Sequence, residues 1–389
     1  FLDLTLLRKE QGASMIKDFL ESHDDVFVGI TCVTQSYAIA LSIAADIKRL
    51  APSVSVMMGG PHVTFTAEET LRRHPQVDFI VMHDGEEATV ALVNDIASNR
   101  REYYRIGGLA YRNDLGTVTV VPCRPPEHNL DIFGFPDRSI FDMQKYLDND
   151  YETVVMTARG CPNRCAFCST SVMGRKYRTH SVRHVLKEVR TLLEMGFQSI
   201  FFGDDTFPAD PERTMELCDA ILQEGLKFEW TCNMRVMDVK PRLIEKMHKA
   251  GMYRTFIGYE SFSPEVLHQF RKGSTPSMQK TAAEILRKAG VELHASMIVG
   301  CSSDTWESVL ENVDYLRDTI RPTLATFNTI ELRPGTDIYQ HPEQYGYFLT
   351  NPLWYEDVHC TDQIHVHTKW LSSQEIRNLC AAAYERFYE

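Results

Sequence analysis

The stretch Val-Val-Met-Thr-Ala-Arg-Gly-Cys-Pro-Asn-Arg-Cys-Ala-Phe-Cys, residues 154–168, decides how the rest of the chain is interpreted. Its β-branched start predicts a short buried strand, which ends at Arg159-Gly160. The loop that follows carries Cys161, Cys165 and Cys168 in the spacing C-x3-C-x2-C. Three thiolates on one short loop can converge on a single metal centre.

The number of cysteines indicates which kind of centre this is. A fully ligated iron–sulfur cluster takes four cysteines, and the next one in the chain is the distant Cys218. Three ligands leave one iron of a four-iron cube open to a chelating molecule, as a catalytic zinc keeps one open position. We therefore expect Cys161, Cys165 and Cys168 to bind one [4Fe–4S] cluster, with no other cysteine as a ligand. The alternatives are a three-cysteine zinc site and three unrelated thiols.

The whole chain has the composition of an ordinary globular protein. Its 389 residues suffice for two or three domains, and 43% are hydrophobic and 24% charged. The net charge of −12 argues against nucleic acid or an anionic membrane as the main partner, and no apolar run is long enough for a membrane span. Ten irregularly spaced cysteines predict a reduced, cytoplasmic protein. The chain starts at Phe1 without a signal-like segment, so we expect part of the natural N-terminus to be missing.

Strand and helix patterns alternate through the first third of the chain. Strands are predicted at 1–6, 26–32, 54–58 and 79–82, and helices at 15–20, 38–50, 68–73 and 91–96. This alternation predicts a doubly wound, flavodoxin-like parallel sheet over residues 1–106, with ligands at the carboxyl ends of the strands. Residues 107–150 are predicted to be a linker that contains a hairpin at 109–121 and a proline-containing stretch at 122–136.

The loops after these strands resemble the cobalamin-binding domain found in front of many radical S-adenosylmethionine (SAM) enzymes. Thr-Cys-Val at 31–33 stands where that fold has Ser-x-Leu, Gly-Gly follows at 59–60, and His-Asp-Gly-Glu at 83–86 partly matches the family's Gly-Glu-Gly-Glu. The resemblance implies that these loops bind cobalamin. The implied contacts are Thr31, Val33, Thr34, Gln35, Gly59, Gly60, His62, Gly85 and Glu86.

The lower axial ligand of cobalamin is a separate question. The fold's Asp-x-His-x-x-Gly, which supplies a histidine ligand, would fall before Phe1, and no visible histidine has this context. We expect the benzimidazole to be displaced without a histidine replacing it. The alternatives are an unliganded flavodoxin-like domain and, for His62, a role in capping a loop.

From residue 151 onward, a strand–helix unit repeats. Strands are predicted at 153–157, 199–202, 228–232, 253–257, 292–299 and 324–332, with five helices between them. Six parallel units over residues 151–340 predict a partial, (β/α)6 relative of the (β/α)8 barrel, with its site at the strand carboxyl ends. Residues 341–389 are predicted to form a C-terminal tail or subdomain. His359, Cys360, His365 and His367 match no tight metal-binding spacing and are predicted to be tail residues over the barrel mouth.

Residues 154–339 resemble the barrel of the radical SAM superfamily. Phe167 matches the aromatic before the third cysteine, and Phe-Gly-Asp-Asp-Thr-Phe at 202–207 resembles the motif that holds the methionine amino group. Arg235, Gly-Tyr-Glu-Ser at 258–261 and Lys272-Gly273 resemble its other SAM contacts. The implied SAM-binding residues are Phe167, Gly203, Asp204, Asp205, Arg235, Glu260, Ser261 and Lys272.

One loop departs from the pattern of that subgroup. Its usual Gly-x-Pro-Gly-Glu-Thr after the fifth strand stands here as Gly-Cys-Ser-Ser-Asp-Thr at 300–305. Cys301 is therefore a candidate catalytic residue, the alternative being a bystander thiol.

The two resemblances together imply a cobalamin-dependent radical SAM enzyme. Its cofactors would be a [4Fe–4S] cluster, SAM and cobalamin, and it would methylate an unactivated carbon of a biosynthetic substrate through a 5′-deoxyadenosyl radical. Its partners would be a small-molecule substrate and a low-potential electron donor such as flavodoxin or ferredoxin. The alternatives are cyclisation, rearrangement, lyase chemistry or transfer of another part of SAM, with a vestigial cobalamin domain, and a non-enzymatic iron–sulfur scaffold.

Overall fold

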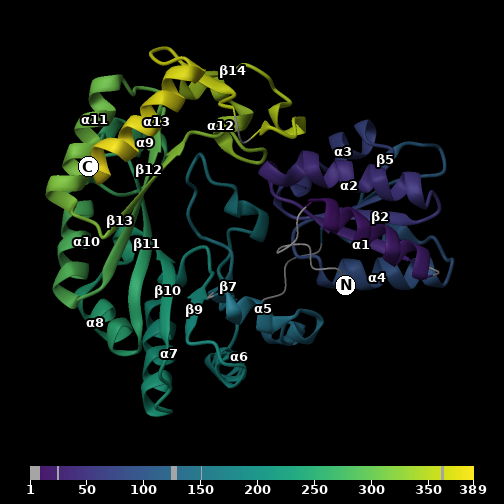
Figure 1. The fold of residues 1–389 in the computed structure, drawn as a ribbon, viewed down its shortest axis with the longest axis horizontal. Coiled ribbons are helices and arrows are strands. Elements are labelled where there is room, and N and C mark those ends of the chain that lie inside the picture. Colours follow the sequence, from purple (N-terminus) through teal and green to yellow (C-terminus); the bar gives the residue numbers. More distant parts are fainter. Residues whose placement is uncertain (1–8, 24–25, 124–128, 150, 361–362) are drawn as a thin grey trace.

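The computed structural model describes residues 9–23, 26–123, 129–149, 151–360 and 363–389. Figure 1 shows an N-terminal α/β domain on the right and an open barrel on the left, with C-terminal segments arching from one to the other. No helix in the described ranges combines the length and the apolar character that crossing a membrane requires.

The N-terminal domain is built around a five-stranded sheet in the order β1-β2-β3-β4-β5. Strands β1 to β3 run parallel, and β4 and β5 are antiparallel to their neighbours. The strands are β1 Phe27–Thr31, β2 Ser55–Gly59, β3 Phe79–Val81, β4 Leu109–Arg112 and β5 Val118–Val120. The helices are α1 Lys9–Ser22, α2 Tyr37–Leu50, α3 Pro61–Arg73 and α4 Glu86–Ala97. The parallel strand–helix alternation is therefore as predicted.

Three details of this domain differ from the prediction or lie beyond it. Helix α3 begins at Pro61 rather than near residue 68. The backbone at Thr66 is non-helical and interrupts the apolar period in the middle of the helix, so the sequence pattern predicted only its second half. The hairpin predicted within the linker pairs with β3, so the sheet extends to Val120 rather than ending near residue 106. The strand predicted at 1–6 lies outside the described residues.

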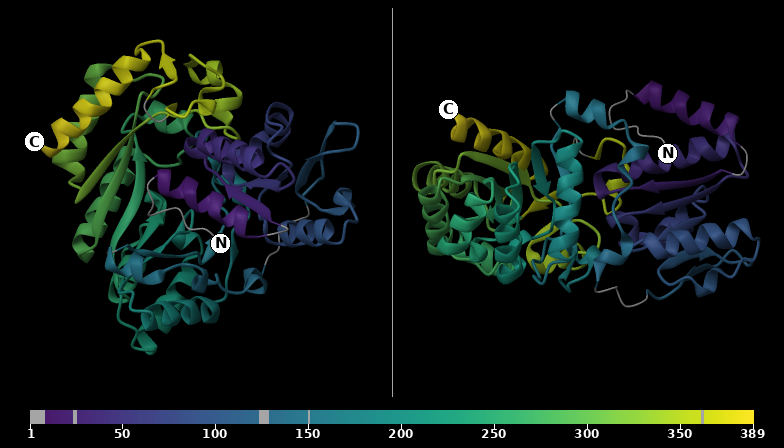
Figure 2. Two further views of the ribbon diagram at one scale, coloured as in Figure 1. Left: turned by 45° about the vertical axis from the view of Figure 1, so that its right-hand side comes forward. Right: turned by 90° about the horizontal axis from the view of Figure 1, so that it is seen from below.

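The barrel is a six-stranded parallel sheet in the order β13-β12-β11-β10-β9-β6. Its strands are β6 Thr153–Val155, β9 Ser199–Phe202, β10 Glu229–Met234, β11 Met252–Glu260, β12 Glu292–Val299 and β13 Leu324–Thr329. Its helices are α6 Val182–Glu194, α7 Pro211–Gln223, α8 Pro241–Lys249, α9 Pro264–Gln269, α10 Pro276–Ala289 and α11 Trp306–Tyr315. They cover the outer face of the curved sheet (Figures 1 and 2). The predicted (β/α)6 barrel is confirmed.

Shorter elements complete the chain between and after these units. They are α5 Met143–Asp148, the small hairpin β7 Ala158–Arg159 with β8 Arg178–Thr179, α12 Asp337–Gln340, β14 Tyr347–Leu349, β15 Val366–Thr368 and α13 Ser373–Tyr388.

The C-terminal helix α13 covers the edge of the barrel. Strand β13 is the last of the sheet, so its outer backbone N–H groups have no strand partner. The Tyr384 and Tyr388 hydroxyls accept hydrogen bonds from the backbone N–H groups of Phe327 and Ala325, at 3.1 and 2.9 Å. Within the predicted tail, this helix therefore closes an edge of the barrel.

A second part of the C-terminal region belongs to the N-terminal core. Trp354, Tyr355 and Cys360 are buried and pack into the hydrophobic cluster built on α2, α3 and β2. The segment between β14 and β15 thus fastens the N-terminal domain to the barrel. Its histidines and Cys360 form no metal-binding group in the part of the chain that the structure describes.

Candidate active site

The cysteine loop leaves the end of β6 through a position that requires glycine. Gly160 has φ of +87°, and a Cβ atom there would lie 2.4 Å from the Lys176 carbonyl oxygen. Further along, Ala166 is bonded on both sides: its N–H donates to Phe270 O at 3.0 Å, and its carbonyl accepts from Ile338 N at 3.2 Å. The barrel therefore holds the middle of the loop in a fixed position.

The three thiols are placed for a cluster rather than for one ion. Cys161 is buried, and Cys165 and Cys168 are half-buried. Among the described residues, no three Cys, His, Asp or Glu ligand atoms that include these sulfurs lie within 4.8 Å of one another. A single ion with bonds of about 2.3 Å would need closer sulfurs, whereas an iron–sulfur cube presents its ligands at separate corners. The zinc alternative is therefore disfavoured by the geometry.

A buried ion pair lies beside these thiols. Lys272 Nζ donates to Glu260 Oε1 at 2.6 Å and lies 5.7 Å from the centre of the Phe167 ring. Burial opposes the lysine charge, yet Glu260 and the Cys165 thiol raise the pKa of Lys272. Burial raises the pKa of the Cys165 thiol, and the positive charge of Lys272 acts against that rise.

The glycine before this pair is explained by the same contact. A Cβ atom on Gly258 would lie 2.0 Å from Glu260 Oε1 and 2.9 Å from Lys272 Nζ. Glu260 itself has φ of +64°, a left-handed conformation that aims its carboxylate back across the strand end. Residue 258 must therefore be glycine, because the Glu260 carboxylate occupies the space where a Cβ atom would lie.

Arg235 links the third strand to the cysteine loop. Its Nε and Nη2 atoms donate to the two Asp238 oxygens at 2.6 Å each, and its Nη1 donates to Asn163 Oδ1 at 2.7 Å. Asn163 in turn donates to Cys161 Sγ at 3.3 Å. The guanidinium is thus fixed in orientation, with its charge beside the loop.

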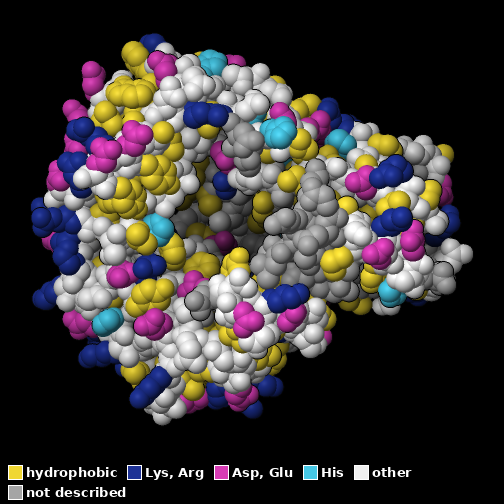
Figure 3. Space-filling model, in the orientation of Figure 1, with side chains coloured by type: hydrophobic (Ala, Val, Ile, Leu, Met, Phe, Trp, Pro, Cys, Tyr) yellow, Lys and Arg dark blue, Asp and Glu magenta, His cyan; other side chains and the backbone are white. Residues whose placement is uncertain are grey.

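These side chains line one cavity of about 510 Å³ inside the barrel. Figure 3 shows a deep hollow on this open side of the molecule, between the barrel wall and the N-terminal domain. Of the residues predicted to bind the cluster or SAM, the cavity is lined by Cys161, Cys165, Cys168, Phe167, Asp205, Arg235, Glu260 and Lys272. These residues, which were predicted from the sequence to share one site, come from four strand ends and their loops and do lie around one cavity.

Asp204 has a different role from the one predicted. Its side chain is fully buried, and it accepts hydrogen bonds from Thr157 N, Ala158 N and Thr157 Oγ1 at 2.6, 2.9 and 2.6 Å. It therefore holds the end of β6 and does not face the cavity. Gly203, also predicted as a SAM contact, is needed for packing, because a Cβ atom there would lie 2.7 Å from Val154 Cγ1.

Two further predictions are corrected by burial. Ser261 is 1% exposed, and its Oγ accepts a hydrogen bond from Ser263 N at 3.1 Å, so it caps a turn away from the cavity. Cys301 is fully buried, and burial raises the pKa of its thiol well above the usual value. Its side chain does not line the cavity, so the structure gives no support to the catalytic role expected from the sequence.

Several cavity residues were missed by the sequence analysis. They are Asn163, Thr170, Arg175, Asn233, Met234, Phe256, Ile257, His294, Ser296 and Thr326. Alternation within β12 was the available signal, because side chains at every second position of a strand share a face and His294 and Ser296 are two apart. His294 Nε2 lies 2.5 Å from Thr326 Oγ1, which places a polar pair in this part of the barrel interior.

The carboxyl edge of the N-terminal sheet faces the barrel. Gln35, just after β1, donates to Glu331 Oε2 of the barrel at 2.7 Å. Thr31 is exposed and Val33 is 48% exposed at this edge, and Gly59 and Gly85 follow β2 and β3. Of the predicted cobalamin contacts, Thr31, Val33, Gly59 and Gly85 are therefore at least partly accessible to a ligand at this edge, whereas the Gln35 side chain is bonded to the barrel.

Two other predicted cobalamin contacts are engaged elsewhere. Gly60 has φ of +100°, and a Cβ atom there would lie 2.5 Å from Cys32 O, so this glycine allows close packing of two backbone segments. His62 is buried between Tyr37 and Tyr355, with ring centres 4.0 and 4.6 Å away, and its Nδ1 contacts Thr34 Oγ1 at 3.2 Å. It is not available as an axial ligand.

A second cavity, of about 390 Å³, lies between the domains. Glu86 lines it from the N-terminal side, and Phe133, Val172 and Arg178 line it from the side of the cysteine loop. Next to it, Arg159 donates to Asp84 Oδ1 at 3.1 Å and to Glu86 Oε1 at 2.6 Å, and Arg178 also pairs with Asp84. These ion pairs hold the edge of the sheet against the base of the cysteine loop.

Comparisons with known proteins agree with the division of the chain into an N-terminal domain and a barrel. The sequence profile of the radical SAM superfamily matches residues 155–316, and that of the B12 binding domain matches residues 3–93. The chain is 34% identical over 385 residues to an uncharacterized methyltransferase, PH0819, of Pyrococcus horikoshii, covering 98% of this chain and 83% of that protein.

Two more distant relatives are named for different reactions. The chain is 29% identical over 321 residues to the anaerobic magnesium-protoporphyrin IX monomethyl ester cyclase of Rubrivivax gelatinosus, covering 80% of this chain and 58% of that protein. It is 26% identical over 336 residues to the hopanoid C-3 methylase of Methylococcus capsulatus, covering 82% and 62%. It thus spans less than two thirds of either of these two relatives.

Solved structures share the fold at low identity. The radical SAM methyltransferase TsrM of Kitasatospora setae, with cobalamin and a [4Fe–4S] cluster bound, superposes with a TM-score of 0.76 at 18% identity, covering 90% of this chain and 71% of that one. The cobalamin-dependent SAM radical enzyme OxsB, with aqua-cobalamin and SAM bound, gives a TM-score of 0.77 at 18% identity, covering 94% and 59%. Both domains and their arrangement along the chain therefore have counterparts in known folds.

Proposed function

Because the chain belongs to the radical SAM superfamily, in the subgroup with an N-terminal B12-binding domain, we propose that it is a cobalamin-dependent methyltransferase acting on a small molecule. The family resemblance predicted from the sequence is thereby confirmed. The observation that carries the proposal is the barrel cavity, where three thiols meet the Glu260–Lys272 pair, Asp205 and the fixed Arg235. The carboxyl edge of the B12-binding domain faces the same side of the barrel.

The donor set fits the cofactors that this family implies. Cys161, Cys165 and Cys168 would hold a [4Fe–4S] cluster with one open iron, and Asp205, Glu260 and Arg235 would position SAM in the cavity beside it. Thr31, Val33 and Gly59 would contact cobalamin at the exposed sheet edge. With these bound, the cofactors supply a reductive cleavage of SAM and a transferable methyl group, which is chemistry that no side chain provides.

The chain itself contributes orientation and exclusion of water. The amino group of SAM carries a positive charge and suits the Asp205 carboxylate. Burial raises the pKa of Asp205, and a hydrogen bond from the Gly160 backbone opposes this rise. The carboxylate of SAM suits Arg235 or Lys272, since each presents a fixed cation. The polar pair His294–Thr326 and Ser296, whose Oγ accepts a hydrogen bond from Asn328 Nδ2 at 3.0 Å, also line the cavity and would orient the substrate.

The proposal is tested by anaerobic turnover of methyl-labelled SAM with a chemical reductant of low potential in place of the natural electron donor. The wild-type protein, loaded with cluster and cobalamin, is expected to produce S-adenosylhomocysteine, 5′-deoxyadenosine and labelled cobalamin. Cys165→Ala is expected to lose the 5′-deoxyadenosine and most of the cluster iron. Cys218→Ala, which changes a buried thiol of α7, is the matched control and should retain both.

A second function is favoured by one observation, the 29% identity to the cyclase. If the protein is a cyclase-like radical enzyme, 5′-deoxyadenosine forms while neither S-adenosylhomocysteine nor labelled cobalamin accumulates. That result would contradict methyl transfer and leave the family assignment intact. Absence of both products from cluster-loaded protein would instead contradict an enzymatic role for the cavity.

A further inference from the structure

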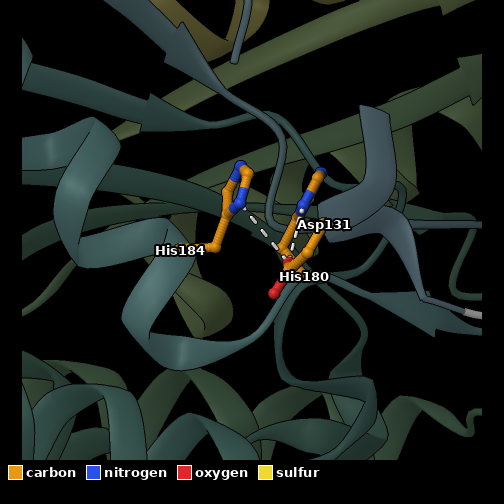
Figure 4. A group of neighbouring side chains, drawn as sticks. All are labelled: Asp131, His180 and His184. Carbon is orange, nitrogen blue, oxygen red and sulfur yellow. Dashed lines mark hydrogen bonds and ion pairs between the residues drawn. The ribbon is translucent and has the colours of Figure 1, made fainter. Parts of the chain in front are cut away.

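Two histidines and an aspartate meet outside the barrel cavity. Asp131 lies in the short 3-10 turn Leu130–Phe133 of the connector between the domains, whereas His180 and His184 come from the end of β8 and the first turn of α6. Figure 4 shows the two imidazole rings and the carboxylate turned toward one another. Their ligand atoms all lie within 4.8 Å of one another, which holds for no other such group in the described ranges.

The distances match the edges of a metal coordination shell. His180 Nδ1 lies 3.2 Å and His184 Nδ1 lies 3.5 Å from the same oxygen, Asp131 Oδ1. With zinc bonds of 2.0–2.1 Å at tetrahedral angles, neighbouring ligand atoms are about 3.3 Å apart. The ligand atoms thus have nearly the spacing of a coordination shell, and rotation of the stacked imidazole rings would aim both Nδ1 lone pairs at one ion.

Hydrogen bonding alone does not explain why both imidazoles lie close to the same oxygen of Asp131. Asp131 Oδ1 already accepts the backbone N–H of Ser181 at 2.9 Å. If both imidazoles also donated from Nδ1, three donors would compete for the two lone pairs of one oxygen. A metal ion removes this competition, because both imidazoles then present lone pairs and the Ser181 N–H orients the ligating carboxylate.

The positions of the ligands are fixed by structure around them. Ser181 caps α6 by accepting a hydrogen bond from His184 N, and His180 N donates to Thr157 O. The two imidazole rings stack at 4.3 Å, and Phe135 covers the other side of His184 at 4.1 Å. Both histidine side chains are 9% exposed and Asp131 is 28% exposed, so one side stays open to a water ligand.

The neighbouring charges are compatible with a bound cation. The Arg159 guanidinium is paired with Asp84 and Glu86, and Arg138 is paired with Glu188. Two nitrogen ligands and one carboxylate suit a transition metal rather than Mg²⁺ or Ca²⁺, which prefer oxygen ligands.

We propose that Asp131, His180 and His184 bind a Zn²⁺ ion that joins the interdomain connector to the start of α6. The site is separate from the cysteine loop and does not depend on the proposed function. Phe133, two residues after Asp131, packs under Arg159 at 5.3 Å. Zinc would therefore fix the connector where it meets the side chain that bridges the two domains.

The test measures metal content in full-length protein whose cluster has been reconstituted, so that the thiols are occupied. After equilibration with Zn²⁺ and removal of free metal, we expect zinc equimolar with the chain. Asp131→Asn and His184→Ala should each weaken zinc binding by about 100-fold or more, with iron content unchanged. Asp137→Asn, an exposed aspartate that caps the next turn of the same connector, is the matched control and should bind zinc like the wild type.

Replacing zinc by Co²⁺ separates this site from the cysteines. The expected spectrum has the visible bands of a tetrahedral cobalt site and lacks the thiolate charge-transfer band. Asp131→Asn keeps an oxygen that can accept the Ser181 N–H, so circular dichroism of this variant should match the wild type. Zinc absent from the wild type, or retained equally by all variants, would overturn the proposal, as would a thiolate band in the cobalt protein.

Discussion

Two neighbouring aspartates at the end of β9 do different work, and the difference lies in which way each side chain turns. Asp204 turns inward and holds Thr157 and Ala158, while Asp205 turns into the barrel cavity. Successive side chains of an extended segment point in opposite directions, so only one of the pair can reach a ligand.

Replacing these two residues should separate stability from binding. Asp204→Ala leaves two buried backbone N–H groups without an acceptor, and we expect it to lower the free energy of unfolding by about 2–4 kcal/mol. Asp205→Ala should leave this free energy within about 0.5 kcal/mol of the wild-type value and weaken SAM binding. Denaturant unfolding and equilibrium dialysis measure the two effects, and equal losses of stability in both variants would contradict the assignment.

The burial of Asp204 also predicts a pH dependence. Burial raises the pKa of Asp204 from 3.8 to about 6 in the folded protein. The folded state therefore binds the proton more tightly than the unfolded state, a contribution to stability that is fully present below pH 3.8 and is lost as pH rises through about 6. Relative to Asp204→Asn, which cannot titrate, the wild type should gain stability as the pH falls from about 7 to about 5. A constant difference between the two proteins would contradict this.

What sequence could predict at this scale follows from how each residue acts. The cysteine spacing and the Gly258-x-Glu260 pair are local, so residue order alone identified them. The inward turn of Asp204, the cap made by Ser261 and the burial of Cys301 depend on packing between distant elements, and no local pattern records them. Asp131 and His180 lie in segments far apart in the chain, so their contact could not be predicted from the sequence. The His180-x3-His184 spacing, in contrast, is a local pattern that the sequence shows.

At the level of elements, the glycine pair before α3 lies at the sheet edge that the sequence predicts, and its second member serves packing between loops. Gly-Gly at 59–60 does follow β2 at the sheet edge. The second glycine, however, contacts the Cys32 backbone, so it serves the crossing of two loops. Helix α3 then carries His62 into the core rather than toward a ligand.

The glycine contact can be tested against a position with the same backbone strain. Gly60→Ala combines a positive φ with a clash against Cys32 O, and we expect it to lower the free energy of unfolding by about 3 kcal/mol. Gly116→Ala is the matched control, because it has φ of +75° with open space around it. It should lose only about 1 kcal/mol. Similar losses in both variants, measured by denaturant unfolding, would show that the clash at Gly60 is relieved.

For the whole molecule, the C-terminal region proved to be a structural part of both domains. Helix α13 supplies tyrosine hydroxyls to the edge of the barrel, and Tyr355 fills the core of the other domain. The sequence of this region has no motif, because a segment that packs against two preformed surfaces needs only a few aromatic residues at suitable places. The alternation of strands and helices in both domains was predictable, whereas the extension of the first sheet by β4 and β5 and the attachment of one domain to the other were not.

Tyr355 provides the test of this attachment. Its side chain is 1% exposed, and its ring packs against His62 and Tyr37. We expect Tyr355→Ala to destabilise the N-terminal domain by about 3–5 kcal/mol and to speed proteolytic cleavage between the domains. Trp370→Ala, which removes an aromatic that is 56% exposed, is the control and should behave like the wild type. Unchanged cleavage in Tyr355→Ala would mean that this segment does not hold the domains together.

The position of Arg159 has a thermodynamic consequence for cofactor loading. This residue lies two positions before Cys161 and holds two carboxylates of the B12-binding domain, so the cysteine loop and the sheet edge share one side chain. If binding at one site changes the affinity of the other through this contact, linkage requires that the two effects be equal in free energy. Each cofactor then changes the affinity for the other by the same factor. The order of loading then affects the rate of assembly and leaves the stability of the fully loaded enzyme unchanged.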